Sequence, residues 1–233
     1  MKKNILIKLS GEALAGNNGH GFDFAYINEI CSRIKQIHDM GYGIGIVCGG
    51  GNFIRGRDTS EMDRILADYA GMMATIINSL ALKDSFVKLG CDVYNQSGLD
   101  VSIMDNIDSD RARSAIKEGK IVIFGGGVGK PFFSTDTGAA LRAKDINADL
   151  IVKLTNVDGV YNKDPNKYSD AIKYETVTFD EVLNNKLEVM DLTAMEICRD
   201  NNIEIVVANI NDSECLIKIV KGEKVGTYVY NGV

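Results

Sequence analysis

The feature that most constrains this sequence is a repeated alternation of short apolar runs with longer stretches of helical period. Residues 4–9 form a strand-like run, and residues 24–40 carry their apolar side chains on one helical face. The same pair recurs at residues 43–48 and in the stretch that begins at Met62. Strands separated by helices of this length are typical of a parallel sheet with helices on both faces. We therefore predict an α/β fold of three layers (αβα) around an open, mostly parallel sheet.

The rest of the chain continues this pattern. Further strands are predicted at residues 91–94, 120–124, 150–154, 204–207 and 227–230, and further helices at residues 109–117 and 136–146. The stretch after Met62 forms a long apolar stripe, made of Ile65, Leu66, Tyr69, Met72, Met73, Ile76, Ile77 and Leu80, whose methionines we interpret as core packing. Thr178 and Glu181 predict a capping box, and Asp191 and Asp212 are suitable N-caps.

The composition is that of an ordinary globular protein. Of the 233 residues 45% are apolar and 25% are charged, and the sequence contains no long linker or fixed-period repeat. We therefore predict one continuous domain over residues 1–233. The formal charge of −6 repels polyanions, so we expect no extended nucleic-acid surface and only a local anion site.

Cysteine and histidine usage excludes several function classes. The five cysteines are scattered without a CxxC pair, which indicates neither a disulfide framework nor a zinc site. His20 and His38 are the only histidines, too few for most histidine-ligated metals or a Ser-His-Asp triad. The start has no long apolar core of a secretory signal, and we expect no run that approaches the roughly 18 apolar residues of a spanning helix. We expect a reducing cytoplasm and no membrane.

Three predicted strands end in glycine-rich turns, at residues 10–11, 49–52 and 125–130. Glycines let backbone N–H groups approach phosphate oxygens without obstruction by Cβ. Each turn has a cation beside it, namely Lys8, Arg55 or Lys130. Lys8 also interrupts an apolar strand, where an unpaired lysine would be costly to bury. Together these features predict a polyphosphate ligand at the strand ends.

Two familiar nucleotide-binding patterns are missing. Gly129 and Lys130 are followed by Pro131, and Phe124 stands where the first glycine of a Walker motif belongs. None of the glycine clusters completes the dinucleotide fingerprint Gly-x-Gly-x-x-Gly. The chain is therefore neither a P-loop protein nor a dinucleotide-dependent oxidoreductase by these criteria.

Two loops offer further binding groups. The segment from Lys130 to Asp136 places hydroxyls and N–H donors at a predicted helix start, which suits a nucleotide phosphate or base, or simply an N-cap and a loop anchor. The segment from Asn156 to Pro165 is a loop whose Tyr161 is suited to stacking on an adenine ring.

Several segments resemble, in order, motifs of the amino acid kinase superfamily and within it of the bacterial UMP kinases. They are KLSGEAL from Lys8, GGGNFIRG from Gly49, DYAGMMATIINSLAL from Asp68, GKPFFSTDTGAALRA from Gly129, VDGVYNKDP from Val157, VMDLTA from Val189 and GEKVGT from Gly222. The resemblance runs nearly from end to end and is far more specific than any single motif.

The resemblance implies transfer of the ATP γ-phosphoryl group to UMP, with Mg²⁺ carried mainly by ATP and no protein metal ligand assigned. It implies ATP contacts from Lys8, Leu9, Ser10, Gly11, Gly51, Arg55, Thr155, Asn156, Tyr161 and Asp164. It implies UMP contacts from Gly50, Asp68, Val128, Gly129, Lys130, Pro131, Phe132, Phe133, Ser134 and Thr135, and catalytic roles for Lys8, Arg55, Asp136 and Asp191. The two acids would orient the catalytic lysine or Mg²⁺, or would simply be N-caps.

The same resemblance implies a UMP side in the N-terminal part and an ATP side in the C-terminal part. It also implies a homohexamer that acts in pyrimidine nucleotide biosynthesis, with GTP as an activator and UTP as an inhibitor. Two alternatives stay open: a non-catalytic nucleotide-binding or regulatory protein of the same fold, and a related carboxylate kinase. Val128 and Lys130 depart from the Thr and Asn of most relatives, and we expect Lys130 to add an anion contact.

Overall fold

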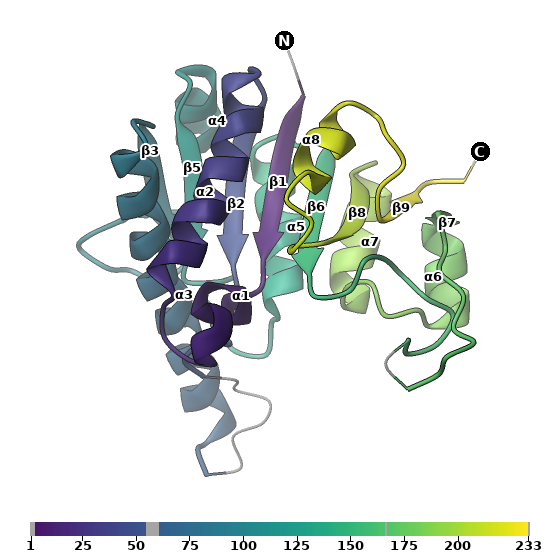
Figure 1. The fold of residues 1–233 in the computed structure, drawn as a ribbon. Helices are drawn as coiled ribbons and strands as arrows, with labels where there is room; N and C mark the ends of the chain where they lie inside the picture. Colours follow the sequence, from purple (N-terminus) through teal and green to yellow (C-terminus); the bar gives the residue numbers. More distant parts are fainter. Residues whose placement is uncertain (1–2, 55–60, 166, 233) are drawn as a thin grey trace.

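The computed structural model describes residues 3–54, 61–165 and 167–232, and within them nine strands form one sheet in the order β4-β3-β5-β2-β1-β6-β8-β9-β7 (Figure 1). The strands are β1 (Asn4–Leu9), β2 (Gly43–Cys48), β3 (Val93–Ser97), β4 (Asp105–Asn106), β5 (Ile121–Gly125), β6 (Leu150–Thr155), β7 (Thr176–Thr178), β8 (Glu204–Asn209) and β9 (Thr227–Tyr230). Described neighbours pair in parallel, except that β9 runs antiparallel to β8. The predicted α/β class with a mostly parallel sheet is confirmed.

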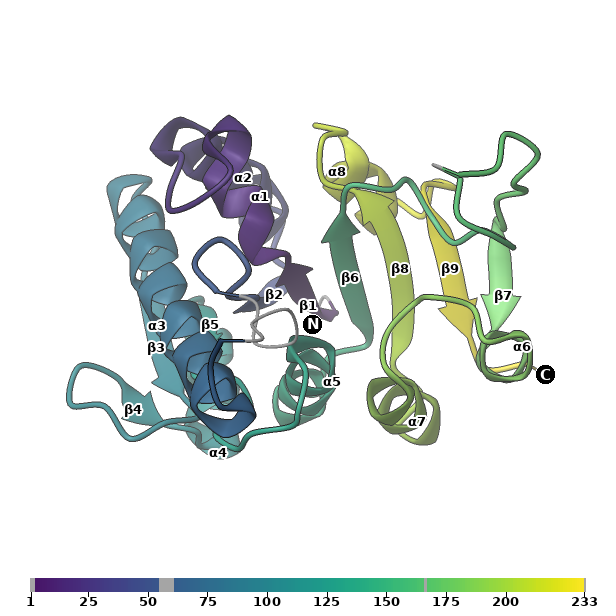
Figure 2. The same ribbon diagram turned by 90° about the horizontal axis from the view of Figure 1, so that it is seen from below.

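Helices cover both faces of this sheet, as the view from below in Figure 2 shows. They are α1 (Gly11–Ala15), the short 3-10 helix η1 (Gly16–Asn18), α2 (Phe24–Asp39), α3 (Arg64–Lys88), α4 (Ser109–Lys117), α5 (Thr135–Asp145), α6 (Phe179–Asn185), α7 (Leu192–Asp200) and α8 (Cys215–Val220). One core cluster joins the sheet to α1, α2, α3 and α8, and the other joins it to α4, α5, α6 and α7. The predicted three layers are therefore present.

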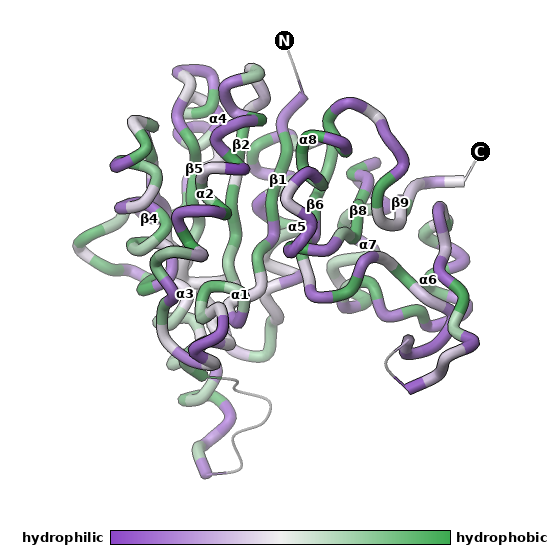
Figure 3. The backbone as a smooth tube through the Cα atoms, viewed as in Figure 1, coloured by the Kyte–Doolittle hydropathy of each residue, from purple (hydrophilic) through white to green (hydrophobic). Residues whose placement is uncertain are grey.

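The central strands are mainly apolar because both of their faces are covered, with Lys8 of β1 and Lys153 of β6 as charged exceptions near their carboxyl ends. Ile5, Leu6 and Ile7 of β1 are all buried, and they pair with Ile44 to Ile46 of β2. Figure 3 shows the same contrast between hydrophobic central strands and hydrophilic connecting loops. The five cysteines, Cys31, Cys48, Cys91, Cys198 and Cys215, are buried as free thiols within these layers.

The third predicted strand is displaced. It was expected at residues 91–94 but runs from Val93 to Ser97. The chain is still leaving α3 at Cys91, whose N–H donates to the Phe86 carbonyl after Gly90 adopts a φ of 81°. The strand then continues through polar residues that an apolar pattern does not mark.

Helix α3 differs most from expectation. Met72 and Ile76 are buried, but the rest of the predicted stripe is exposed: Ile65, Leu66, Tyr69, Met73, Ile77 and Leu80. The interpretation of the methionines as core residues is therefore right for Met72 and wrong for Met62 and Met73. The reason is that α3 turns small and polar residues, including Asn78 and Ser79, toward its own protein. Most large apolar residues of the predicted stripe therefore lie on its outward face.

By length and composition alone, α3 is apolar enough to span a bilayer, with a mean hydropathy of 1.4 in its most apolar window. The helix nevertheless packs against α2, β3 and β5 as part of one layer of the fold. Its buried face also carries amide and hydroxyl side chains that bond within the protein. We interpret it as a core helix with one uncovered side.

The predicted helix caps are correct at two positions and wrong at two. Thr178 and Glu181 form the predicted capping box of α6, and Asp191 is the N-cap of α7. Asp212 does not cap a helix: α8 starts after Glu214, and the Asp212 carboxylate accepts the Glu214 N–H in a local turn. Asp136 is not an N-cap either, because Ser134 takes that position in α5.

Candidate active site

The site lies where the carboxyl ends of four adjacent strands meet. Strands β5, β2, β1 and β6 are neighbours and run in parallel, so their C-terminal loops open onto one edge of the sheet. A cleft of about 720 Å³ occupies this edge, extending from β1 and α1 past α3 and α5 to residues 188–191. It includes residues of all three glycine-rich turns.

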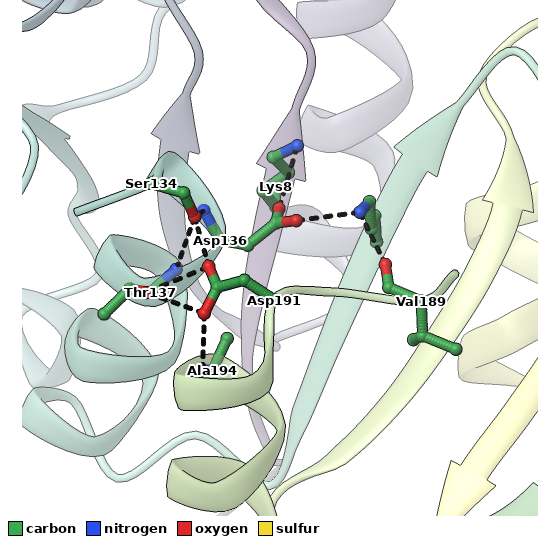
Figure 4. A network of polar contacts seen from close by, with 8 residues as sticks. Lys8, Ser134, Asp136, Thr137, Val189, Asp191 and Ala194 are labelled. Atoms are coloured by element: carbon green, nitrogen blue, oxygen red, sulfur yellow. Dashed lines mark hydrogen bonds and ion pairs between the residues drawn. The ribbon is translucent and has the colours of Figure 1, made fainter. Parts of the chain in front are cut away.

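Two lysines face one carboxylate at the centre of the cleft (Figure 4). Lys8 on β1 and Lys153 on β6 are paired in the sheet register, so both side chains leave the same face. Their Nζ atoms lie 3.1 and 3.0 Å from the two carboxylate oxygens of Asp136. Lys153 also donates a hydrogen bond of 2.6 Å to the Val189 carbonyl. These contacts hold two cations close together at the strand ends.

The surroundings change the acidity of these groups. Burial raises the pKa of the Asp136 carboxyl, but Lys8 and Lys153 together outweigh it and hold that pKa below its ordinary value. Burial lowers the pKa of Lys153 below that of an ordinary lysine, although Asp136 acts in the opposite direction. Lys153 is thus closer to losing its proton than a surface lysine is.

Asp191 holds the starts of two helices together. It caps α7 by accepting the Ala194 N–H at 2.9 Å. The hydroxyls of Ser134 and Thr137 from α5 also donate to its carboxylate, the latter at 2.9 Å to both oxygens (Figure 4). The carboxylate is therefore occupied by donors from the protein. The predicted catalytic residue Asp191 is placed here as a link between α5 and α7 beside the cleft.

The first two glycine turns touch each other through their backbones. A Cβ added at Gly11 would stand 2.5 Å from the Gly49 carbonyl oxygen and 2.6 Å from the Gly51 nitrogen. No side chain fits in that space. The close approach brings the N-terminus of α1 and the loop after β2 to one place on the cleft wall.

The loop that follows the third glycine turn is held by residues of α3. The Phe132 N–H donates a hydrogen bond of 2.8 Å to Asp68, although Phe132 has a φ of 70° that non-glycine residues seldom adopt. Arg64 pairs with the other oxygen of Asp68 at 3.0 Å and lies 5.7 Å from the centre of the Phe132 ring. Asp68, expected to contact UMP, thus fixes the backbone of the loop at Phe132.

Many of the predicted site residues line this one cleft: Lys8, Ser10, Gly11, Gly50, Gly51, Asp68, Lys130, Phe132, Phe133, Ser134, Thr135, Asp136 and Asp191. Others do not line it: Leu9, Val128, Gly129, Pro131, Thr155, Asn156, Tyr161 and Asp164. Leu9 is fully buried in the core, and its carbonyl accepts the Gly49 N–H. Tyr161 donates to Asp158 in the loop beyond β6. Arg55 lies outside the described residues.

Sequence reasoning missed Lys153 and Arg64. Lys153 interrupts an apolar strand in the same way as Lys8, so the signal that marked the first lysine was present for the second. Arg64 has no such signal, because a charged residue at a helix start is ordinary. Its role is visible only once Asp68 and Phe132 are placed beside it.

Comparison with known proteins agrees with this geometry. The model of the amino acid kinase family matches residues 3–209. The chain belongs to the amino acid kinase family. Two solved structures are similar to it over nearly the whole chain. The UMP kinase of Bacillus anthracis has a TM-score of 0.95 at 35% identity, covering 99% of this chain and 97% of that one. The UMP kinase of Ureaplasma parvum has a TM-score of 0.93 at 37% identity, covering 99% and 100%.

A third solved structure, at lower sequence identity, is also similar in fold. The uridylate kinase of Archaeoglobus fulgidus gives a TM-score of 0.76 at 26% identity, covering 98% of this chain and all of that one. Family membership makes the chain a kinase, and the cleft with its paired lysines is the part of the fold suited to phosphoryl transfer.

Proposed function

We propose that this chain transfers the γ-phosphoryl group of ATP to UMP and forms UDP and ADP. The observation that carries this proposal is the pair Lys8 and Lys153 around Asp136, in a chain similar over its full length to two UMP kinases. A site that brings two phosphate anions together needs fixed cations and backbone donors rather than a nucleophile of its own.

The chemistry follows from the charges of the substrates. A phosphate oxygen of UMP attacks the γ-phosphorus of ATP, and the bond from that phosphorus to the bridging oxygen of ADP breaks. A phosphate monoester is mostly dianionic at neutral pH, so the attacking oxygen needs no general base. Lys8 and Lys153 stabilise the charge that spreads over the transferring group. No covalent intermediate is required.

We place the two nucleotides on opposite sides of the lysines. The UMP side comprises Gly50, Asp68 and the loop from Val128 to Thr135, in the N-terminal part of the chain. The ATP side comprises the turn at Ser10 and Gly11, Gly51, and the loop after β6 that carries Thr155, Asn156, Tyr161 and Asp164. The order β5-β2-β1-β6 in the sheet supports this arrangement, because Lys8 on β1 lies between β5, whose loop belongs to the UMP side, and β6, whose loop belongs to the ATP side.

Mg²⁺ is expected to enter with ATP. Among the residues that the structure describes, no three metal-ligating side chains gather at one point. Asp136 and Asp191 are already engaged by lysines and by hydroxyls. Mg²⁺ keeps several waters and commonly binds substrate phosphates with few protein ligands, which suits such a site. When bound, it would neutralise phosphate charge and help to align the substrates.

We also propose a homohexameric assembly. The uncovered apolar face of α3 supports self-association, since an exposed stripe of this kind is typical of an interface. Activation by GTP and inhibition by UTP, a cytoplasmic location and a role in pyrimidine nucleotide biosynthesis rest on the family resemblance alone.

The deciding experiment is ADP formation by the purified chain with ATP and Mg²⁺, run in parallel with UMP, CMP, dUMP, acetylglutamate and aspartate. We expect turnover with UMP and none with the two carboxylates. Turnover with a carboxylate alone would replace the proposal with a carboxylate kinase. Binding of ATP and UMP without any UDP would mean a non-catalytic nucleotide-binding protein.

A further inference from the structure

A fully buried pair of amides lies behind the glycine turn at residues 49–51. Asn52 and Asn78 are 2% and 0% exposed, and each donates to the other's side-chain oxygen, at 2.9 and 2.8 Å. Asn52 ends the glycine turn, whereas Asn78 comes from the middle of α3. Nothing in the proposed reaction uses either side chain directly.

The second N–H of each side-chain amide donates a hydrogen bond to the backbone of a loop. Asn78 donates to the Gly49 carbonyl at 2.7 Å, and Asn52 donates to the Gly21 carbonyl at 2.9 Å. The Gly21 N–H returns a bond of 2.9 Å to the Asn52 carbonyl. All four side-chain N–H donors are thus used, as a buried polar network requires. A carbonyl can only accept, so the Gly49 contact also fixes which way the Asn78 amide is turned.

The same turn packs directly on the backbone of α3. A Cβ added at Gly50 would stand 2.7 Å from the Gly71 carbonyl oxygen. On its other side the Gly49 N–H donates to the Leu9 carbonyl at 3.0 Å, and Gly11 fits against Gly49 and Gly51. The turn is therefore clamped between α3 and the loop after β1, and Asn78 supplies the side-chain bonds of that clamp.

We propose that Asn52 and Asn78 are positioning residues, which hold the 49–51 turn in the conformation that presents the backbone N–H groups of Gly50 and Gly51 to substrate phosphates. That the ligand is a substrate phosphate rests on the proposed function. That the two amides hold the turn rigid rests on the hydrogen bonds alone. Backbone N–H donors stabilise a phosphate best when they are already oriented toward it before it binds. A more flexible turn should therefore weaken binding of the phosphate group specifically.

The test uses Asn78→Leu, which keeps the approximate size of the side chain and removes its hydrogen bonds. Ser85→Ala is the matched control, because Ser85 is also buried on α3 but bonds to Asn28, away from the turn. Amide hydrogen exchange over residues 49–53 is measured in the full chain without ligand. We expect exchange there to accelerate at least tenfold in Asn78→Leu and to stay unchanged in Ser85→Ala.

Kinetics supply the second readout. We expect the KM for UMP to rise at least tenfold in Asn78→Leu, while inhibition by uridine, which lacks the phosphate, is unchanged. If Asn78→Leu does not fold, Asn52→Ala removes the same pair from the loop side and carries the same expectations. Unchanged exchange over residues 49–53 in a folded variant would overturn the inference. If exchange accelerates in Asn78→Leu but the native chain makes no UDP, the positioning role of the two amides is supported and the proposed function is rejected.

Discussion

Lys8 and Lys153 occupy paired positions on the neighbouring strands β1 and β6 and share the carboxylate of Asp136. Adjacent strands lie about 4.8 Å apart, so the hydrogen-bonded ladder sets the spacing of these lysines. Two ammonium groups at this separation repel each other unless an anion lies between them. Asp136 supplies that anion at the start of α5, where a negative charge is also favoured by the helix dipole.

Removing the second lysine should reduce turnover strongly. We expect Lys153→Met to lower kcat by at least about 100-fold, the usual cost of losing one donor to a developing charge. Lys153→Arg should retain part of the activity. The pKa of Lys153 is lowered by burial, so native activity should fall with rising pH before an ordinary lysine titrates near about 10.4. In Lys153→Arg that alkaline fall should move to higher pH, because arginine keeps its proton. If activity falls over the same alkaline pH range in both proteins, a group other than Lys153 causes the fall.

Replacing Asp136 by asparagine should destabilise the fold at neutral pH. Removing one partner of a buried charge cluster costs about 3 kcal/mol, and two lysines lose their anion here. The folded pKa of Asp136 is below its unfolded value, so its contribution is present above the unfolded pKa and is lost as pH falls through the folded pKa. The stability difference between native protein and Asp136→Asn, measured by urea unfolding, should therefore shrink under acid conditions.

A matched control for Asp136 exists on the same helix. Asp145 forms a partly buried ion pair with Arg142 at 3.1 Å, outside the cleft. Asp145→Asn should also lose stability but should keep kcat. Loss of activity in both variants to the same degree would mean that the Asp136 effect is merely one of stability.

Asp191 should behave as a link between helices. In Asp191→Ala the cap of α7 is lost, which costs about 1 kcal/mol, and the hydroxyls of Ser134 and Thr137 lose their acceptor. The Val189 carbonyl that holds Lys153 is two residues away, so we expect kcat to fall about tenfold. Asp108→Ala removes a comparable cap from α4, away from the cleft, and should leave kinetics unchanged. A normal kcat in Asp191→Ala would show that the position of α7 does not affect the phosphoryl-transfer step.

The uncovered face of α3 should control assembly. Leu66 and Ile77 are 59% and 44% exposed, and a glutamate at either place would put a charge into an apolar contact. We expect the native chain to sediment as an oligomer and Leu66→Glu or Ile77→Glu to sediment as smaller species. Ile172→Glu, at a still more exposed apolar residue in the loop before β7, should leave the assembly intact. A native chain that sediments as a monomer would contradict the proposed interface.

Lys130 is the fifth test. It lines the cleft, and no carboxylate of the described residues pairs with it, whereas Lys8, Lys153 and Arg64 are all paired. Lys130→Asn should raise the KM for UMP about fivefold, as expected for one exposed ionic contact. Lys144→Asn, an exposed lysine of α5 outside the cleft, is the control. Unchanged UMP affinity and turnover would remove any special role for Lys130.

The sequence predicts the order of layers well because buried parallel strands have an unmistakable apolar signature. It predicts the short strands β4 and β7 poorly, since two or three residues carry no period. The stripe on α3 shows a deeper limit: periodicity identifies an apolar face but does not say whether that face meets its own core or another surface. Asn78 was invisible for a related reason, because one buried amide in a helix has no pattern until its partner Asn52 is placed.

The reactivity of the buried cysteines reports local unfolding of the layers that cover them. Burial raises the pKa of Cys31, Cys48 and Cys198 to about 12, so almost no thiolate is present at neutral pH while the fold is closed. Cys198 is the one cysteine in the layer of α4 to α7, and the other four belong to the opposite layer. The order in which a thiol-reactive reagent modifies them would reveal which side of the sheet separates first.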